Sequence, residues 1–518
     1  MYTDSRFYTL DYNPKEYPVT LVFNSEVKNS NTAFVSPWQP LANHYQSVMK
    51  SEYEIIDKEG VGLRYEKSNF DFADTVTFTK TSTGIKCNAQ NLTAIRNQDY
   101  SPSLKKFTPY LKVALSKFEL EDVEGTATSW QELGKWQYDN LIHGRDEISD
   151  ATTQEIKNLV TGIEDPIERA KKVYQYVQDK TRYISIQVGI GGWQPIEASE
   201  VDEFKYGDCK GLTNYTKALL KVADVPAHYA VVYAGRAKND IDPDFPSMQG
   251  NHVILNLPQE NQQDIWLECT SQKTPFGFIG DFTDDRNVLL VKPNGGQIKK
   301  TIGYYEKDNY QKIDGALKLD ANGDLFADFT IASEGTQFDH KYFLQDRSKR
   351  KILKFYRNYY DHFKNIKIEN YDFQRDDKNV VFRENLKIKA KSYAQKFGNR
   401  LMFIPNALNQ TFSVPDQYDQ RISPFTISRG YFDEDELIFT VPENMKVESM
   451  PEDILLKTKF GEYKAQFEKK ESNKISYKRS MLIKKGNYKK QDYQAFRDFM
   501  YQIKTKDQSK IILVKKPT

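Results

Sequence analysis

The chain has 518 residues, of which 39% are hydrophobic, 13% aromatic and 28% charged. This composition excludes disorder or low complexity over most of the chain, and a usual domain size of about 100 to 200 residues predicts about three folded domains. The 74 basic and 72 acidic side chains leave a formal net charge of +2, too small to steer a polyanion, so no nucleic-acid partner is expected.

Residues 1–122 are predicted to form an N-terminal β-rich domain. Strand-like runs such as YPVTLVFNSEV and DTVTFTKTSTGIKCNA alternate there with turn clusters rich in Asn, Ser and Pro. The start, MYTDSRFYTL, has neither the basic nor the apolar region of a signal peptide. No window holds the ~18 to 20 apolar residues of a membrane-spanning helix, so no transmembrane segment is expected in this chain.

Residues 123–300 are predicted to form a mixed α+β core. The pattern turns helical at ATSWQELGKWQYDNLI, where Trp130 and Trp136 lie on one side. A second helix is predicted in DPIERAKKVYQYVQDK, with Asp165 as its N-cap and Pro166 at its first position.

The run YGDCKGLTNYTKALLKVADVP places Cys209 at the start of a third, amphipathic helix, which Pro226 ends. The 23 residues from Ile184 to Tyr206 hold three glycines and a proline and predict a long irregular approach to this helix. Four β-rich runs follow, and they predict the sheet on which the helix packs: AHYAVVYAG, NHVILNL, DIWLECT and NVLLVKP.

Residues 301–518 are predicted to form a C-terminal β-rich domain, in which Asn322-Gly323 marks a hairpin turn. Two helical patterns interrupt the strands, SKRKILKFYRNYYDHFKN and QDYQAFRDFMYQI, and their aromatic stripes are expected in the core. Both terminal domains are expected to be sandwich-like.

The chain has three cysteines, Cys87, Cys209 and Cys269, an odd number that is far too small for a disulfide framework at this length. Their spacings match no paired zinc-ligand pattern, and the six histidines are scattered. No structural metal and no cofactor are therefore expected.

One constellation of residues can support chemistry. A thiol attacks as its thiolate, which the unpaired N–H groups and the dipole at a helix start stabilise, and Cys209 occupies such a position. Two strand-like runs downstream carry His252 and Glu268. A base that activates the thiol and an acid that orients the base complete the logic of a catalytic triad.

The two runs resemble an antiparallel hairpin, so their register can be predicted. If the loop centres on Glu260, residue i opposes residue 520 minus i, and His252 lies directly opposite Glu268 on one face. Because side chains alternate, Trp266 and Thr270 share that face, while Cys269 faces away from the site.

Each of these residues also has a plain structural interpretation. A lone cysteine before a helix is more often a small buried residue than a nucleophile, and a lone strand histidine is usually a satisfied polar residue. The joint occurrence of Cys209, His252 and Glu268, in this order and on these elements, favours an active site.

The motifs YGDCKGLTNYTKALL, NHVIL and WLECT resemble the core of the transglutaminase-like superfamily, which is related to papain-type cysteine enzymes. The whole chain resembles Gram-negative envelope proteins in which this core lies between two β domains of unknown function. The resemblance therefore implies an α+β, transglutaminase-like (papain-like) core between two β-rich, sandwich-like domains.

The resemblance also implies roles for individual residues. Cys209 matches the nucleophile and His252 the base, while Glu268 stands at the acidic position, which is commonly aspartate. The backbone N–H of Cys209 is a natural first donor to an oxyanion, and Gln187 or Trp193 in the approach segment is a candidate second donor.

Two classes of function follow. The first is a thiol-dependent acyl-transfer enzyme acting on a protein or peptide substrate, as a protease or amidase when water accepts the acyl group and as a transglutaminase when an amine does. The second is an inactive transglutaminase-like scaffold, or a peptide- or glycan-binding protein. The resemblance suggests the periplasm or cell envelope, with a signal peptide missing from this sequence. Oligomeric state and calcium dependence are left open.

The loop RAKNDIDPDFPSMQG, residues 236–250, immediately precedes His252 and is polar and proline-bearing. It is predicted either to gate the cleft or to be a plain surface excursion.

Overall fold

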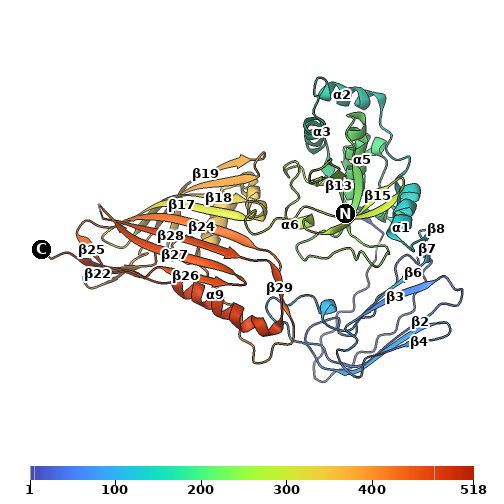
Figure 1. Cartoon of the computed structure of the whole chain (residues 1–518), viewed down its shortest axis with the longest axis horizontal. Helices are drawn as coiled ribbons and strands as arrows, with labels where there is room; N and C mark the ends of the chain where they lie inside the picture. The colour runs from blue at the N-terminus through green and yellow to red at the C-terminus, as the bar shows by residue number, and fades with distance from the viewer. Residues whose placement is uncertain (1, 5, 472, 518) are drawn as a thin grey trace. The chain divides into compact units, whose positions relative to one another are not determined.

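The chain forms two compact units in the computed structural model, which describes residues 2–4, 6–471 and 473–517 (Figure 1). Unit 1 contains the residues up to Ala42, Gln46–Ala94 and Thr108–Gly303. Unit 2 contains Asn43–Tyr45, Ile95–Phe107 and the residues from Tyr304 onwards. The division into three domains with boundaries at 122 and 300 stays a prediction.

The N-terminal part of unit 1 is built of small antiparallel sheets. Strand β5 (Gly84–Leu92) lies between β2 (Val48–Ile56) and β4 (Thr77–Lys80), β3 (Leu63–Ser68) pairs with β6 (Tyr110–Leu115), and β7 (Lys117–Leu120) pairs with β8 (Val123–Thr126). Alternate residues of β5 are buried, as expected for a strand with one face on a core.

One predicted strand is absent. Residues 17–27, the run YPVTLVFNSEV, form no strand and pair with none of the described strands. Side chains such as Leu21 and Phe23 are consequently exposed. Alternation alone favours a strand, but only a neighbouring strand can supply the hydrogen bonds that make one.

The mixed core of unit 1 contains an antiparallel five-stranded sheet covered by helices. The strand order is β14 (Ile265–Leu267), β13 (His252–Leu257), β12 (His228–Val232), β15 (Asn287–Lys292) and β16 (Gly295–Lys300). The four predicted runs are thus adjacent strands. Helix α5 (Cys209–Val222) packs on β13, and α1 (Trp130–Gln137) packs on β15 and β16.

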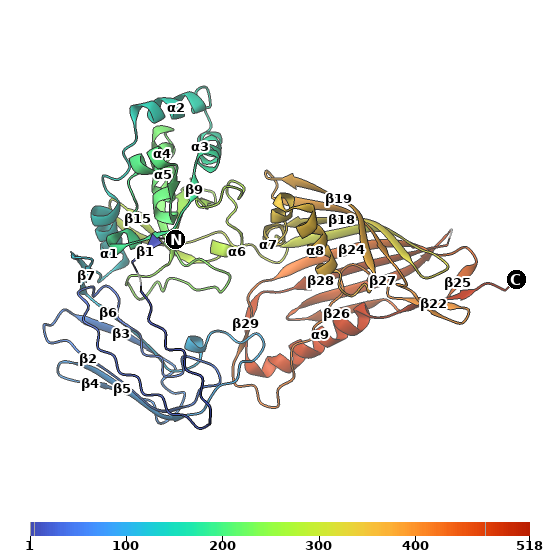
Figure 2. The same cartoon turned by 180° about the vertical axis from the view of Figure 1, so that it is seen from behind.

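Three helices surround α5 and hold it in place (Figure 2). They are α2 (Asp150–Val160), α3 (Pro166–Lys180) and α4 (Ala198–Phe204). Helix α3 begins as predicted, because the Asp165 side chain accepts a hydrogen bond from the Ile167 N–H and Pro166 occupies the first turn. The approach segment is less irregular than expected, since its seven-residue helix α4 is too short to show a clear period in the sequence.

Unit 2 is built on one eight-stranded sheet. Its strand order is β19 (Ile366–Asp376), β20 (Val381–Ala390), β18 (Leu325–Glu334), β17 (Tyr310–Leu319), β24 (Tyr431–Thr440), β28 (Lys474–Ile483), β27 (Gly461–Lys470) and β26 (Ile454–Thr458). The predicted hairpin turn at Asn322-Gly323 joins β17 to β18 and is confirmed, with Gly323 at a φ of +87°.

The remaining elements of unit 2 complete its fold. Helices α8 (Lys349–Tyr359) and α9 (Tyr493–Asp507) form where the two helical patterns predict them, and α9 runs along β26 to β28 (Figure 1). Its stripe of Phe496, Phe499 and Ile503 is buried, as expected. Unit 2 also contains a four-stranded sheet in the order β21 (Gln395–Phe397), β22 (Arg400–Phe403), β30 (Ile511–Lys515) and β25 (Met445–Ser449). It further contains the pair β23 (Phe425–Ile427) and β29 (Gly486–Tyr488) and the short helix α7 (Thr336–Asp339).

A buried ion pair joins α9 to this sheet. The Arg479 guanidinium on β28 lies 2.9 Å from Asp435 on β24 and 3.1 Å from Asp507 on α9, and all three side chains are at most 1% exposed. The Tyr463 hydroxyl also donates to Asp507, at 2.8 Å. Removing the cation would leave two buried carboxylates without their charged partner.

We therefore expect Arg479→Met to destabilise unit 2 by about 3 to 5 kcal/mol. The neighbouring Lys478→Met is a matched control, because Lys478 pairs with Glu436 at the surface, with both side chains at least 41% exposed. That change is expected to cost about 0 to 1 kcal/mol. Urea unfolding followed by hydrogen exchange in β24, β28 and α9 measures both, and equal effects would contradict the role of the buried pair.

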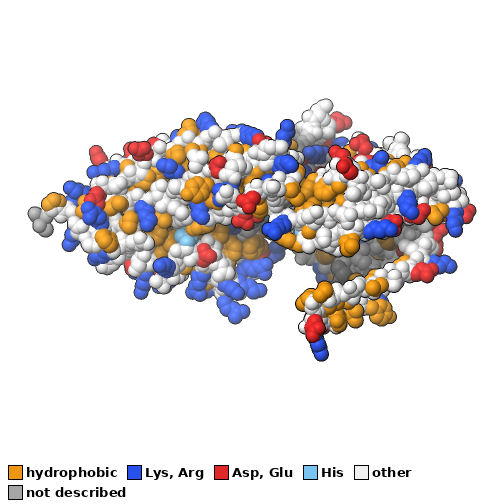
Figure 3. Space-filling model, turned by 90° about the horizontal axis from the view of Figure 1, so that it is seen from below, with side chains coloured by type: hydrophobic (Ala, Val, Ile, Leu, Met, Phe, Trp, Pro, Cys, Tyr) orange, Lys and Arg blue, Asp and Glu red, His pale blue; other side chains and the backbone are white. Residues whose placement is uncertain are grey.

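The face drawn in Figure 3 carries both basic and acidic side chains, in keeping with the small net charge. Among the described residues, no helix has both the length and the apolar composition needed to cross a membrane.

Candidate functional site

Cys209 is the first residue of helix α5. The helix begins there because the Asp208 side chain caps it, accepting a hydrogen bond from the Gly211 N–H at 2.9 Å. The buried Lys210 ammonium also bonds to Asp208 and so neutralises the cap. Cys209 is 7% exposed and borders a cleft, which places its sulfur where a reactant can approach the positive end of the helix dipole.

The hairpin that carries His252 and Glu268 has a register different from the predicted one. Leu255 pairs with Leu267 and Leu257 with Ile265, so the hairpin centres on Asn261 rather than Glu260. Continuing this register, residue i opposes residue 522 minus i, and His252 and Glu268 are diagonal neighbours rather than directly opposite. A shift by two residues keeps both side chains on one face, because side chains alternate with a period of two.

The diagonal arrangement still joins the two side chains. His252 Nε2 lies 2.9 Å from Glu268 Oε2, and both residues are buried. Thr270 fixes the other carboxylate oxygen, since its N–H and hydroxyl donate to Glu268 Oε1 at 3.0 and 2.5 Å. This role of Thr270 was not predicted from the sequence, although strand alternation places Thr270 on the same face as Glu268.

The electrostatics of this pair favour its charged form. Burial by itself lowers the pKa of His252, but the Glu268 carboxylate and a hydrogen bond with Cys209 outweigh burial and raise the pKa to about 10. Burial by itself raises the pKa of Glu268, but the charge of His252 and hydrogen bonds from His252 and Thr270 hold it below its usual value. An imidazolium beside the Glu268 carboxylate is therefore favoured here at neutral pH. The Phe282 and His252 rings pack in a T-shaped arrangement, with their centroids 5.3 Å apart.

The other two cysteines are buried and lie outside the cleft. Burial raises the pKa of Cys87 to about 11 and that of Cys269 to about 12. Cys269 packs in the core with Leu255 and Leu267, on the side of the hairpin that faces α5, so it points away from His252 as predicted. Neither thiol borders the described cleft.

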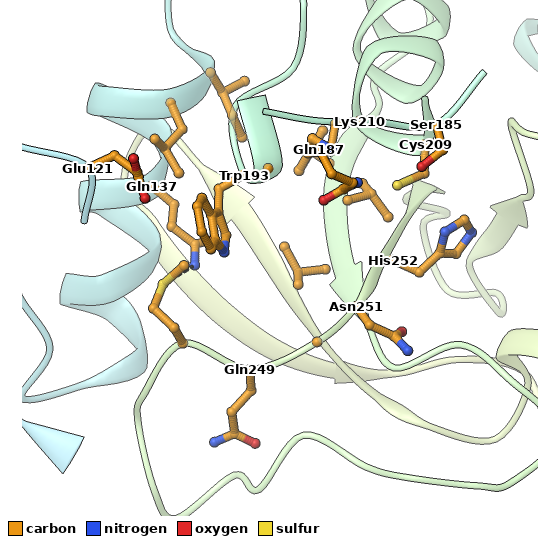
Figure 4. A pocket seen from close by; sticks show the side chains of 18 of the residues that line it. Glu121, Gln137, Ser185, Gln187, Trp193, Cys209, Lys210, Gln249, Asn251 and His252 are labelled. Atoms are coloured by element: carbon orange, nitrogen blue, oxygen red, sulfur yellow. Dashed lines mark hydrogen bonds between the residues drawn. The ribbon is translucent and has the colours of Figure 1, made fainter. Parts of the chain in front are cut away.

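The cleft beside Cys209 has a volume of about 610 Å³ and also includes His252, Gln187 and Trp193 in its lining. Figure 4 shows Cys209 and His252 at one end of the pocket and Trp193 with Gln137 at the other. Gln187 lies between the two ends in this view. Of the two candidate oxyanion donors, the geometry therefore favours Gln187, because the Trp193 indole packs against Phe34 on the far wall.

The loop 236–250 is anchored rather than loose. Ile241 and Phe245 are buried, the Trp130 indole donates to the Pro243 carbonyl at 2.8 Å, and Arg64 donates to the Pro246 carbonyl at 2.7 Å. These contacts favour the interpretation that the loop is a fixed part of the protein over the interpretation that it opens and closes the cleft. Composition made the loop look polar and mobile, because the few apolar side chains that anchor it do not form a periodic pattern.

The last residue of this loop, Gly250, is close-packed just before His252. Its φ is +98°, and a Cβ there would lie 2.5 Å from Val231 Cγ1. We expect Gly250→Ala to displace the start of β13 and to lower stability by about 1 to 3 kcal/mol, with a loss of thiol reactivity at Cys209.

Gly235→Ala is the matched control, since Gly235 also has a positive φ, +124°, but open space around its Cα. Thermal unfolding and the rate of Cys209 alkylation check the difference. Equal effects of the two substitutions would show that backbone strain, rather than crowding against Val231, is what matters.

The described residues hold no cluster of three or more His, Cys, Asp or Glu side chains that could bind a metal ion.

These features define a class: an α+β core in which a cysteine at a helix start meets a histidine and a carboxylate from a neighbouring hairpin. Residues 153–274 match the model of the Transglutaminase-like superfamily, and residues 399–513 match that of DUF3858, a domain of unknown function with a solved structure. The chain thus carries a transglutaminase-like domain followed by a DUF3858 domain, and the resemblance stated from the sequence is confirmed.

Two solved structures are similar to the chain. A "putative protease" from Parabacteroides distasonis ATCC 8503 shares 12% identity with a TM-score of 0.51, over 91% of this chain and 73% of that one. At this identity the likeness concerns the fold alone. A "putative cysteine protease" from Cytophaga hutchinsonii shares 13% identity with a TM-score of 0.19, over 43% of this chain and 66% of that one. No curated protein matches the chain.

Proposed function

We propose that the protein is a thiol-dependent acyl-transfer enzyme that acts on peptide or amide bonds. The observation that carries this proposal is the buried 2.9 Å contact between His252 and Glu268, with His252 and Cys209 together lining one end of an open cleft. A carboxylate that orients an imidazole, and an imidazole that lies beside a thiol, are the three parts of a cysteine triad.

In the first half of the reaction, the Cys209 thiol gives its proton to His252, and the resulting thiolate attacks the carbonyl carbon of the scissile amide and forms a C–S bond. His252, kept protonated by Glu268, gives its proton to the leaving nitrogen as the C–N bond breaks, which leaves a thioester and a free amine. The Cys209 backbone N–H, with Gln187 as the proposed second donor, stabilises the oxyanion that forms between these steps.

In the second half, an acceptor attacks the thioester while neutral His252 takes its proton, and the thiolate leaves. Water as acceptor releases an acid, which is hydrolysis, and a primary amine yields a new amide, which is transamidation. We propose hydrolysis as the main outcome. On the resemblance alone, the proposed location is the periplasm or cell envelope, which cell fractionation tests.

The experiment is incubation with a peptide library, with and without a primary amine, read by mass spectrometry. Cleaved peptides support hydrolysis, and peptides heavier by the amine less ammonia support transamidation. Cys209→Ala is the control that must show neither. If peptides bind but neither product forms, the proposal fails and the alternative of an inactive binding module stands.

A further inference from the structure

An extended segment of the chain itself lies in the cleft. Strand β1 (Tyr2–Thr3) pairs in parallel with β10 (Ile186–Gln187), with Tyr2 opposite Ile186 and Thr3 opposite Gln187. The Asp4 carboxylate accepts a hydrogen bond from the Gly189 N–H at 3.1 Å. Both Thr3 and Asp4 are among the residues that line the cleft with Cys209. The backbone edge of the approach segment therefore accepts an extended polypeptide next to the proposed nucleophile.

The far wall of the same cleft is apolar and aromatic. The Phe34 and Trp193 rings lie 5.6 Å apart at an interplanar angle of 31°, and Phe34 is 47% exposed. Leu141, Ile142 and Met248 line the cleft with them. Figure 4 shows Trp193 well separated from Cys209, so this wall is positioned to contact a side chain rather than the reacting carbonyl.

We propose that the substrate is an extended peptide whose backbone pairs with Ile186–Gln187 and which places a large apolar side chain against Phe34 and Trp193. This inference rests on the proposed function, and it names the substrate class of the same site. Residues Tyr2–Asp4 occupy the backbone track in the free protein and compete with the peptide for it.

The chemistry of this wall determines which substrate side chain the subsite prefers. Two aromatic rings with aliphatic neighbours offer contact area to Phe, Trp or Leu but little to Ala. Loss of such a contact typically costs about 10- to 200-fold in kcat/KM for each methylene-sized change, so the discrimination between Phe and Ala should be large.

The first arm uses peptides that are identical except for one position occupied by Ala, Leu, Phe or Trp, scanned along the sequence. With the unaltered protein, kcat/KM at one position should rise at least about tenfold from Ala to Phe. Trp193→Ala and Phe34→Ala should each lower kcat/KM for the Phe peptide far more than for the Ala peptide, and so remove most of that preference. Phe72→Ala is the matched control, an aromatic that is 39% exposed and does not line the cleft. If the preference for Phe over Ala survives both cleft substitutions, Phe34 and Trp193 do not form the subsite and the proposal is overturned.

The second arm tests the backbone track. Thr3→Pro with Asp4→Ala removes the pairing and the carboxylate, and it should lower KM severalfold at unchanged kcat. Asp4→Asn keeps an acceptor for Gly189 and should have a smaller effect. An unchanged KM in the double variant would overturn the proposal that Tyr2–Asp4 and the peptide compete for pairing with Ile186–Gln187.

A third arm separates this inference from the proposed function. The Kd of the same peptides is measured on Cys209→Ala protein by fluorescence titration. A Phe-over-Ala preference that depends on Trp193 supports the subsite even if the unaltered protein turns nothing over. Equal Kd values for all four peptides would overturn the subsite even in an active enzyme.

Discussion

Replacing Cys209 with alanine is expected to abolish acyl transfer, with a loss in kcat of about 10⁵- to 10⁶-fold. The physical reason is that no other described side chain can form the thioester in this cleft. Peptide binding should persist, because the wall and the backbone edge do not depend on the sulfur. Turnover of a fluorogenic peptide and equilibrium binding of the same peptide measure the two quantities separately.

The other cysteines provide internal controls for this experiment. Cys87→Ala and Cys269→Ala remove thiols whose pKa values burial raises to about 11 and about 12, and neither residue borders the cleft. Activity should survive both changes, within the limits of any destabilisation by the small cavities they leave. Iodoacetamide should label Cys209 selectively in the folded protein, and peptide mapping reports which thiol reacted.

A different labelling result would contradict the proposed nucleophile. If Cys209 reacts no faster than a free thiol at any pH, and His252→Ala leaves its rate unchanged, then the contact between histidine and thiol has no chemical effect. In that case the domain is a binding module, and the cleft serves recognition without turnover.

The second large effect is expected from Glu268→Gln, which keeps the shape of the side chain and removes its charge. Glu268 is the main group that raises the pKa of His252 to about 10, so this pKa should fall toward its ordinary value of 6.5 or below. The imidazolium is then lost near neutral pH, and kcat/KM at pH 7 to 8 should fall by about 10²- to 10⁴-fold. The alkaline limb of the pH profile should move to lower pH.

The pH dependence of kcat/KM and the NMR titration of the His252 ring check this prediction. Glu260→Gln is the matched control, because Glu260 lies exposed in the loop of the same hairpin and should shift neither curve. An unchanged alkaline limb in Glu268→Gln would show that Glu268 does not set the protonation of His252.

The same pair also affects stability, and the sign follows from the directions of the two pKa shifts. His252 has a raised pKa, so its contribution is complete below 6.5 and is lost as the pH rises through about 10. Glu268 has a lowered pKa, so its contribution is present above 4.5 and is lost as the pH falls through its folded value. The ion pair therefore stabilises unit 1 most between these limits, and the Glu268→Gln protein should lose stability chiefly there.

In the hairpin, the sequence predicts which side chains share a face but not the exact register. Alternation put His252, Glu268 and Thr270 on one face and Cys269 on the other, and these relations hold in the structure because a register shift of two does not change them. The centre of the loop was placed one residue too early, at Glu260 instead of Asn261. Nothing local distinguishes the two, since pairing across a seven-residue loop depends on which side chains fit the rest of the core.

In the approach segment, the sequence does not distinguish the two candidate donors. In the sequence, Gln187 and Trp193 are equivalent candidates for the second oxyanion donor. Both carry a side-chain N–H group, and both lie in the same glycine-rich stretch. Their separation in space depends on Phe34, about 160 positions earlier in the chain, against which the indole packs. Contacts over such distances leave no periodic signal in the sequence.

By itself, the sequence determined the existence and type of the strongly patterned elements: the capped helix α3, the cysteine helix α5, the strands that carry His252 and Glu268, and the hairpin turn at Asn322-Gly323. These depend on local periodicity and capping, which a short stretch of chain contains. Only the tertiary structure decided the register of the hairpin, the separation of Gln187 from Trp193, the anchoring of loop 236–250 and the occupation of the cleft by Tyr2–Asp4. Each of these depends on side chains or backbone groups that are distant in the sequence and meet only when the core is packed.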